Sequence, residues 1–428
     1  MATSRRQFIK RGLGAVTVSV MVPKMGLLKA LGQETAARLD RRLVVIQFGG
    51  GNDGLNTIIP YSDSRYLSLR PTLSFKDTEL VDSAGVSTMI NSELGFHPVM
   101  KEIRDLYQQN KVAIMLGVGE PNQSTSHFTG TTNIANGGTN GSLNGGGWLG
   151  RYAKQAFGGS ANFTAAAIGG SLPQMFYSDY VIPNISSFAQ YTFQTDNRFT
   201  PDRKNQVAAF NSATGRSFPG DNLMTAIAGT GKRAFDDSVT IQTETAKYNP
   251  TGYPNTGIGN ALKMVSQLLV TIPSTSLTHL QLGGFDTHQG QIQNGSKLVN
   301  GHAGLLMQFS QAIKAFHDDI AAQPNNLGQN TIIMTYSEFG RRPQENGTSG
   351  SDHGSLSCWF VIGDSVQGGI YGRQPSLLAL DLDGGGNPKF GVNSIDLRSI
   401  YATILNKWFN HDPRAVLDGG PFAELPFL

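Results

Sequence analysis

The stretch LVVIQFGGGNDG, residues 43–54, joins an apolar run directly to a polar loop. Leu43–Phe48 is apolar apart from Gln47 and rich in β-branched residues, which is typical of a strand covered on both faces. Three glycines end the run, and Asn52 and Asp53 follow at once. Four further runs predict buried strands of the same kind, at Val112–Gly117, Leu277–Leu282, Thr331–Tyr336 and Cys358–Ile362.

Segments with helical periodicity alternate with these strands, at Pro98–Gln109, Trp148–Phe157, Gly257–Val270, Gly304–Ala321 and Asp396–Phe409. Such alternation predicts an α/β fold with a mostly parallel sheet and helices on both faces. No low-complexity linker divides residues 33–428, so we expect one domain. Residues 170–250 have weak periodicity and many aromatic, Asn, Thr and Pro residues, and we expect a cap or insertion there.

Polar side chains follow the predicted strands where each one ends. The strand ends are followed by Asn52-Asp53, by Glu120 and Asn122–His127, by Asp286-Thr287-His288, by Ser337–Arg342, and a little later by Asp352-His353. In open parallel sheets the ligand site lies outside the carboxyl ends of the strands. Carboxylates and imidazoles bind divalent ions such as Zn²⁺, Mn²⁺, Mg²⁺ or Ca²⁺. We therefore predict one or two metal ions held by residues from the set Asp53, Asp286, His288, Glu338, Asp352 and His353.

Each of these residues also has a plain structural explanation. Asp53 among glycines stabilises a turn in many proteins. Asp286 and His288 point to the same side of an extended segment, which suits a shared ion or a simple hydrogen bond. Glu338 could equally form an ion pair with Arg341. Only their joint placement at the strand ends favours a site.

A hydroxyl that opens a helix after the second strand would gain from the positive end of the helix dipole. Ser126 is the first candidate for a nucleophile, followed by Ser124 and Thr125. The alternative is that Ser126 only caps the helix.

Residues 49–54 also match the pattern G-x-G-x-x-G of dinucleotide sites. The next residues, Leu55–Pro60, are β-branched and end in proline, which makes a poor first helix for such a site. A secreted redox protein with a bound nucleotide is therefore the least favoured hypothesis.

The first residues predict export. Ser4–Lys10 reads SRRQFIK, and a short, mostly apolar run follows at Leu13–Val22, as in a twin-arginine (Tat) signal. A small-residue site at residues 30–32 predicts a mature chain from Gln33, with Ala36-Ala37 as the second choice. The apolar run is too short for a transmembrane helix. We expect a periplasmic or secreted protein that meets the Tat translocase during export.

The charge of the predicted mature chain argues against nucleic acid. Residues 1–32 hold six of the 34 basic residues and no acid, so 28 basic residues face 31 acidic ones in the remainder. A slightly acidic protein has no basic face for nucleic acid. The single cysteine, Cys358, excludes a disulfide framework within the chain and is expected to be buried in its strand.

The chain resembles the bacterial domain-of-unknown-function 1501 family. The resemblance rests on FGGGNDGLNTIIPY, FHP, STSHF, GWLGRYA, GGFDTH, YSEFGRRPQENGTSGSDHG, GGIYG and the closing PFAELPFL. That family is grouped with the alkaline phosphatase-like superfamily, which includes sulfatases. The resemblance implies an alkaline phosphatase-like three-layer sandwich.

Carried onto this sequence, the superfamily pattern gives Asp53 the place of the first metal-binding aspartate and Ser126 that of the nucleophile. Asp286 and His288 resemble the aspartate and histidine of the other metal, and His353 resembles the late histidine. Glu338-Phe339 stands where many members have Asp-His, unless Asp352-His353 is that pair. Arg341 is implied to bind the substrate's oxyanion.

Two departures from the pattern stand out. One residue separates Asp286 from His288 where phosphatases have three, and the sequence has no Cys-x-Pro-x-Arg segment of the type I sulfatases. The resemblance implies an exported metal-assisted hydrolase of phosphate or sulfate esters, carried by small molecules or glycans. The alternative is a non-enzymatic exported binding or assembly protein on a degenerate scaffold.

Overall fold

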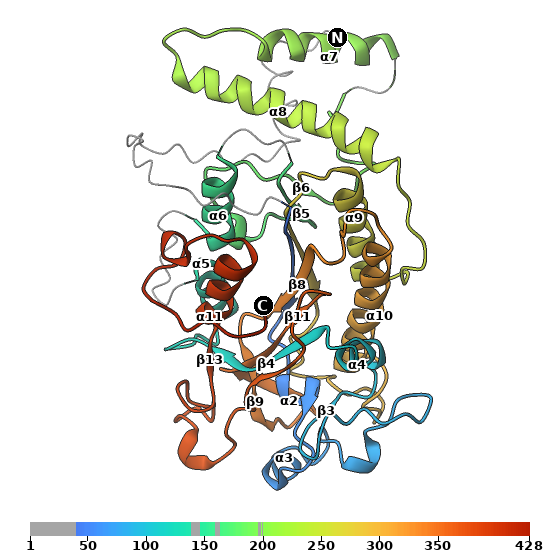
Figure 1. The fold of residues 1–428 in the computed structure, drawn as a ribbon, viewed down its shortest axis with the longest axis vertical. Coiled ribbons are helices and arrows are strands. Elements are labelled where there is room, and N and C mark those ends of the chain that lie inside the picture. The colour runs from blue at the N-terminus through green and yellow to red at the C-terminus, as the bar shows by residue number, and fades with distance from the viewer. Residues whose placement is uncertain (1–39, 138–145, 159–162, 196–197, 199) are drawn as a thin grey trace.

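The computed structural model describes residues 40–137, 146–158, 163–195, 198 and 200–428. The expected twin-arginine signal and its cleavage site lie outside these residues. The chain folds around one large sheet with helices on both sides (Figure 1).

The central sheet has nine strands and is mainly parallel, as expected. Its order is β12-β4-β11-β8-β1-β7-β5-β6, and β13 pairs with β4. The strands are β1 (Arg42–Gly49), β4 (Val112–Gly119), β5 (Ala165–Ile168), β6 (Asn184–Ile185), β7 (Leu277–Gly283), β8 (Thr331–Tyr336), β11 (Ser357–Ile362), β12 (Gly369–Gly372) and β13 (Ile395–Asp396).

Strand β11 differs from the expectation, because it runs antiparallel to both β4 and β8. The cause is the hairpin that follows β8, formed by β9 (Gly340–Glu345) and β10 (Ser351–Gly354). The hairpin returns the chain to the sheet without a crossover helix, so β11 enters from the end where β8 leaves.

Alternate residues of β1 face the two helical layers. Val44, Ile46 and Phe48 pack in one hydrophobic cluster, and Leu43 and Val45 pack in another. The first cluster contains side chains of α4 (Lys101–Gln108), α9 (Gly257–Thr271) and α10 (Gly301–Ala321). The second contains side chains of α5 (His127–Asn136), α6 (Trp148–Phe157), α11 (Leu397–Thr403) and the π-helical turn Ile404–Trp408. The expected three layers are therefore present.

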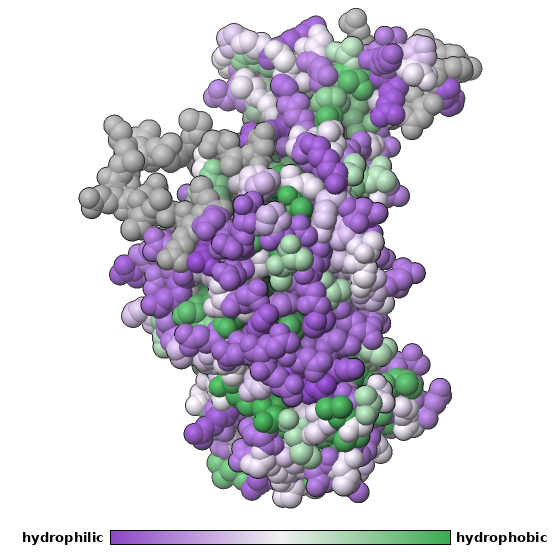
Figure 2. Space-filling view, turned by 45° about the vertical axis from the view of Figure 1, so that its right-hand side comes forward, coloured by the Kyte–Doolittle hydropathy of each residue, from purple (hydrophilic) through white to green (hydrophobic). Residues whose placement is uncertain are grey.

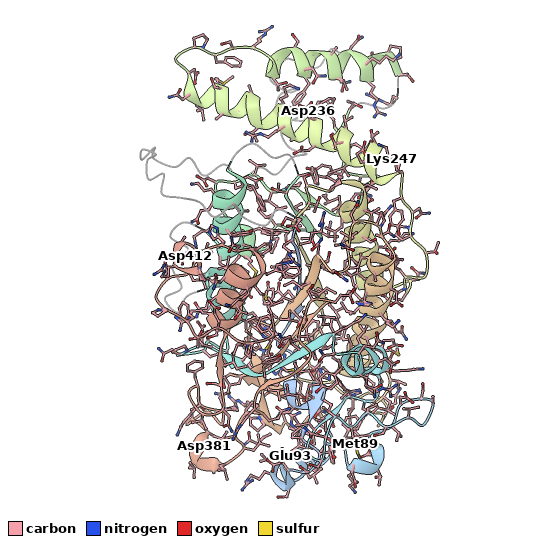
Figure 3. The ribbon with its side chains drawn as sticks, viewed as in Figure 1. Met89, Glu93, Asp236, Lys247, Asp381 and Asp412 are labelled. Atoms are coloured by element: carbon pink, nitrogen blue, oxygen red, sulfur yellow. The ribbon has the colours of Figure 1, made fainter. Side chains whose placement is uncertain are left out.

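Shorter elements complete the chain beside this core. They are α2 (Gly54–Thr57), the strand pair β2 (Ile58–Ile59) and β3 (Gly95–Phe96), α3 (Ser64–Leu69), and 3₁₀ turns at Asp77–Glu79, Gln174–Phe176, Ala379–Asp381 and Pro413–Ala415. Exposed apolar side chains occur at the lower end of the molecule, among them Met89 (Figures 2 and 3).

The segment 170–250 contains a helix pair, α7 (Thr200–Thr214) and α8 (Asn222–Thr245), that projects from the sheet end opposite β9 (Figures 1 and 3). No residue of α7 is buried. Asp319 of α10 anchors the segment that follows α8. It accepts hydrogen bonds from Tyr248 and Tyr253 of that segment, the latter at 2.7 Å, and from Ser266 of α9 at 2.5 Å. None of the helices in the described residues combines the length and hydrophobicity needed to cross a bilayer.

Candidate metal centre

The loops that follow β1 and β7 begin side by side. Gly49 is in register with Gly283, and the Phe285 N–H donates to Gly49 O at 3.0 Å. Gly50 has a φ of 119°, and a β-carbon there would clash with the backbone nitrogen of Asp286. Glycine is therefore required for the loops to approach this closely, and the approach places Asp286 at the rim of the sheet.

Three histidines surround the Asp286 carboxylate. Its Oδ1 lies 3.1 Å from His288 Nε2 and 3.0 Å from His353 Nε2, and its Oδ2 lies 3.5 Å from His127 Nε2. The Nε2 atoms of His288 and His353 are 2.9 Å apart. Ligand atoms of His127, Asp286 and His353 all lie within 4.8 Å of one another.

The Nδ1 atom of each histidine faces an acceptor. His288 Nδ1 donates to Asp352 Oδ1 at 2.9 Å, His353 Nδ1 to Thr125 O at 2.8 Å, and His127 Nδ1 to Glu338 Oε1 at 3.0 Å. Because a carbonyl or carboxylate oxygen can only accept, each Nδ1 carries the proton in a neutral ring. All three Nε2 lone pairs then point toward Asp286.

This electrostatic arrangement is compatible with a bound cation. Burial raises the pKa of Asp286, but the hydrogen bond from Arg341 and the charge of that guanidinium outweigh it and lower that pKa well below its usual range. Burial lowers the pKa of His353, which favours the neutral ring. An ionised carboxylate and converging imidazole lone pairs fit a bound cation, and acceptors on Nδ1 are the usual outer partners of metal-binding histidines.

Glu338 supports the site from behind. Its side chain is 4% exposed, and Oε1 accepts from the Gly50 N–H at 2.7 Å as well as from His127. Its Oε2 is buried and has no partner among the described residues. Phe339 packs against His353 and His127, with ring centroids 4.3 and 5.0 Å apart. Glu338 thus orients His127. Its unpartnered Oε2 is compatible with a further positive charge near the site.

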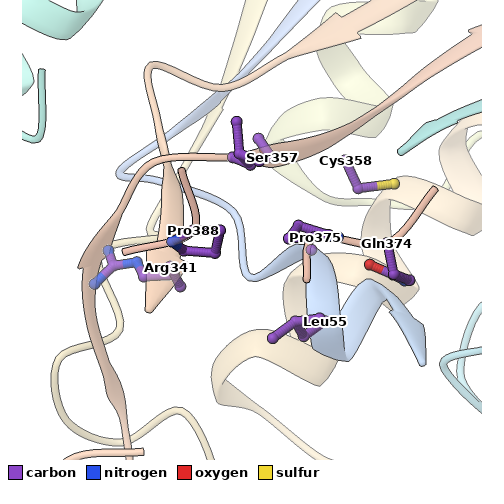
Figure 4. A pocket seen from close by; sticks show the side chains of 9 residues that line it. Leu55, Arg341, Ser357, Cys358, Gln374, Pro375 and Pro388 are labelled. Atoms are coloured by element: carbon purple, nitrogen blue, oxygen red, sulfur yellow. The ribbon is translucent and has the colours of Figure 1, made fainter. Parts of the chain in front are cut away.

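Arg341 does not present its guanidinium to solvent. Its side chain is fully buried, and it donates to Gly51 O, Ser351 O and Phe285 O at 2.8, 2.6 and 2.9 Å and to Asp286 Oδ1 at 2.8 Å. It also borders a cavity of about 10 Å³ beside Ser357 and Cys358 (Figure 4). Instead of the free oxyanion-binding group that was expected, Arg341 clamps three loops together and positions Asp286.

Asp53 lies apart from the histidines, in an ion pair. Its Oδ2 contacts Arg70 Nη1 at 2.6 Å and accepts from Gln291 Nε2 at 2.5 Å, and the side chains of Asp53 and Arg70 are 1% and 0% exposed. Burial raises the pKa of Asp53, but Arg70 outweighs it and holds that pKa below its usual range. Asp53 Oδ1 is buried without a partner. The expected first metal-binding aspartate thus has a guanidinium in the place of an ion.

The remaining predicted residues lie at the edge of the site. Ser126 is exposed and precedes the first residue of α5, and its hydroxyl makes no cap hydrogen bond. Its N–H donates to Ser124 Oγ at 3.2 Å. Asp352 holds His288 from outside and accepts from Asn346 Nδ2 at 3.1 Å, which places it behind the ligand set.

The structure thus brings together Asp286, His288 and His353, with Glu338 and Asp352 behind them. His127 joins them although the sequence reasoning gave it no role. The signal was present in STSHF, because His127 directly follows the three candidate hydroxyl residues.

The three-layer α/β fold and this cluster define an α/β protein with a candidate metal centre at one rim of the sheet. The model of the family described as "Protein of unknown function (DUF1501)" matches residues 40–408. The chain therefore belongs to the DUF1501 family, as the sequence motifs predicted. No curated protein matches the chain in sequence.

Several solved structures match the chain at low similarity. An alkaline phosphatase superfamily protein from Vibrio parahaemolyticus is 10% identical, with a TM-score of 0.37 over 99% of this chain and 80% of that one. The zinc complex of the C-terminal periplasmic domain of EcEptC from Escherichia coli is 10% identical, with a TM-score of 0.34 over 76% and 73%. The PsFucS1 sulfatase from Pseudoalteromonas sp. is 14% identical, with a TM-score of 0.34 over 90% and 70%.

Proposed function

We propose that the protein is an exported, metal-dependent hydrolase of phosphate or sulfate esters, with the metal held by Asp286, His288, His353 and His127. The observation that carries the proposal is the 2.9 Å approach of the His288 and His353 Nε2 atoms. Two imidazole lone pairs facing each other repel unless a cation lies between them and the carboxylate.

The donor set narrows the choice of ion. Three imidazoles and one carboxylate suit Zn²⁺ or a similar transition metal, whereas Mg²⁺ and Ca²⁺ prefer oxygen ligands. Arg70 already neutralises Asp53, so this chain has no reason to bind a second ion at that residue. We therefore propose one ion.

The site is open enough for a substrate. The side chains of Asp286, His288 and His127 are 47%, 43% and 40% exposed. When bound, a divalent ion there would neutralise an anionic ester and lower the pKa of a hydroxyl beside it. Ser126, at the N-terminus of α5, offers that hydroxyl, and the first N–H groups of α5 favour negative charge near it.

Other residues of the chain position the metal ligands. Arg341 fixes the Asp286 carboxylate, while Glu338 and Asp352 keep the protons of His127 and His288 on Nδ1. The Nε2 atoms then stay free as ligands. With Arg341 buried, the anionic group of the substrate has to be held by the metal and the N-terminus of α5.

A direct test combines a metal count with an activity assay. Protein exported through its own signal and purified without chelator should contain about one equivalent of a transition metal. It should hydrolyse a generic aryl phosphate or sulfate, and Ser126→Ala should abolish turnover while leaving the metal bound. Metal-free protein that ignores both esters would disprove the proposal.

The alternative, an exported binding protein without catalysis, is favoured by one observation. The expected oxyanion-binding arginine, Arg341, and the expected first metal-binding aspartate, Asp53, are both engaged inside the protein. Metal-loaded protein that turns over no ester, and whose biological phenotype survives Ser126→Ala, would support this alternative.

A further inference from the structure

Phe128 projects into solvent from the first turn of α5, directly beside His127. The residue is 85% exposed, and none of the large apolar residues in the described part of the chain is more exposed. None of the three hydrophobic clusters of the described residues includes it. Because burying an aromatic ring is favourable, the ring at this position serves no purpose in the fold and is free to contact a ligand.

The position of Phe128 is fixed by how α5 is seated. At Gly130, a β-carbon would lie 2.9 Å from Glu338 O and 3.4 Å from Phe339 Cδ1, so the first turn of α5 packs closely on the base of the metal centre. Helical side chains lean toward the N-terminus, which here is the end occupied by His127. Phe128 directly follows His127 in this first turn, so its ring and the imidazole project from the same end of α5, on a rigid element.

The sequence neighbours of Phe128 are polar. Gln123, Ser124, Thr125, Ser126 and His127 precede it, and Thr129 follows it. An exposed aromatic ring next in the chain to hydroxyl groups and an imidazole suits a ligand that is polar at its edges and apolar on one face.

We propose that Phe128 contacts the substrate by packing against a flat ring in the alcohol part of the ester, an aryl or a pyranose ring. This inference rests on the proposed function for the position of the phosphate or sulfate group, and it adds the class of alcohol. The anionic group lies at the metal centre and the ring of the alcohol lies over Phe128. Esters of small alcohols that lack a ring gain nothing from this contact.

The test compares two non-hydrolysable ligands on zinc-loaded protein by calorimetry. Wild-type protein should bind phenylphosphonate at least about tenfold more tightly than methylphosphonate, since one apolar contact supplies discrimination of that order. Phe128→Ala should reduce the preference to less than about twofold and leave the affinities for methylphosphonate and zinc unchanged. Phe128→Tyr should keep the preference.

The matched control is Leu223→Ala, which removes another exposed apolar residue, 55% exposed, from α8 at the far end of the molecule. It should leave both affinities unchanged. A parallel titration with glucose 1-phosphate separates the two kinds of ring, and it is made in Ser126→Ala protein so that the ester is not hydrolysed. If Phe128→Ala weakens binding of this sugar and leaves phenylphosphonate unaffected, the ring is a pyranose. The reverse result assigns an aryl group.

Failure of this inference can be told from failure of the proposed function. The role of Phe128 alone is overturned if the protein binds zinc and both phosphonates with equal affinity and Phe128→Ala changes the affinity for neither phenylphosphonate nor glucose 1-phosphate. Protein that binds neither zinc nor any phosphonate overturns the proposed function and the role of Phe128 with it.

Discussion

His288 Nε2 and His353 Nε2 face each other at 2.9 Å, and the Nδ1 proton of each ring is held from behind by Asp352 Oδ1 or Thr125 O. Neither neutral ring can turn its N–H toward the other without losing that hydrogen bond. Two neutral rings thus present two lone pairs beside the Asp286 carboxylate, an arrangement that a bound cation would stabilise.

Removing the metal should therefore destabilise the protein. We expect dialysis against EDTA to lower the Tm of the wild-type protein, since a ligand at 100 times its Kd stabilises by about 2.7 kcal/mol. His353→Ala should remove this EDTA effect together with the bound metal. The control is His411→Ala, at an exposed histidine that contacts Gln155. Calorimetry and elemental analysis measure both effects, and an EDTA effect that survives in His353→Ala would contradict the assignment.

Glu338→Gln should weaken metal binding without removing it. The amide can still accept from the Gly50 N–H, but it no longer holds the His127 Nδ1 proton through a charged oxygen. Loss of such an outer partner typically costs about 10- to 100-fold in metal affinity. Competition with a chromophoric chelator at neutral pH measures the change. Unchanged affinity would show that His127 is no ligand.

Asp53→Ala should destabilise the fold more than it affects the metal. It would leave the guanidinium of Arg70 buried without its ion pair, which typically costs about 3–5 kcal/mol. The double variant Asp53→Asn with Arg70→Met should recover much of that stability. Urea unfolding measures the free energies. If Asp53→Ala keeps its stability and loses its metal, Asp53 is the metal ligand that the sequence suggested.

Glu120 should make stability depend on pH. Burial raises the pKa of this glutamate to about 7, from an ordinary value of 4.5, although Asn133 donates to it at 2.7 Å. The folded state favours the protonated form, so this contribution is fully present below about pH 4.5 and is lost as pH rises through 7. Glu120→Gln, which mimics the protonated form, should stabilise the protein by up to about 3 kcal/mol at pH 8.

The difference should shrink toward zero at pH 4.5, and urea unfolding at both pH values measures it. Glu93→Gln, at an exposed glutamate, is the control and should give no pH-dependent difference. Equal stability of Glu120→Gln and wild type at pH 8 would contradict the raised pKa.

The sequence predicted the strands well because buried strands have a distinctive composition. Leu43–Phe48 and Thr331–Tyr336 were expected and lie within β1 and β8. The short strand Ala165–Ile168 was not expected, because four residues with three alanines have no recognisable pattern. The antiparallel direction of β11 could not be predicted either. The composition of a strand indicates that it is buried but not whether it runs parallel or antiparallel to its neighbours.

The residues of the candidate site were partly accessible in the same way. Asp286, His288 and His353 were selected because they follow strands, and parallel strands bring their carboxyl ends to one edge. The partners of Arg341 and Asp53 could not be predicted in this way, because the paths of the loops in three dimensions determine which residues these side chains contact. Arg70 is 17 residues from Asp53 in the chain, and nothing in its own neighbourhood marks it as buried.

The sequence by itself determined the family, the layered α/β class and the polar residues at the strand ends, because these depend on local composition and on periodicity along the chain. Only the tertiary structure decided which of those residues converge on the Asp286 carboxylate and which neutralise one another. Charges interact over a few ångströms in space, and the separation of Asp286 from His353 in the chain, 67 residues, does not reveal the 3.0 Å between them.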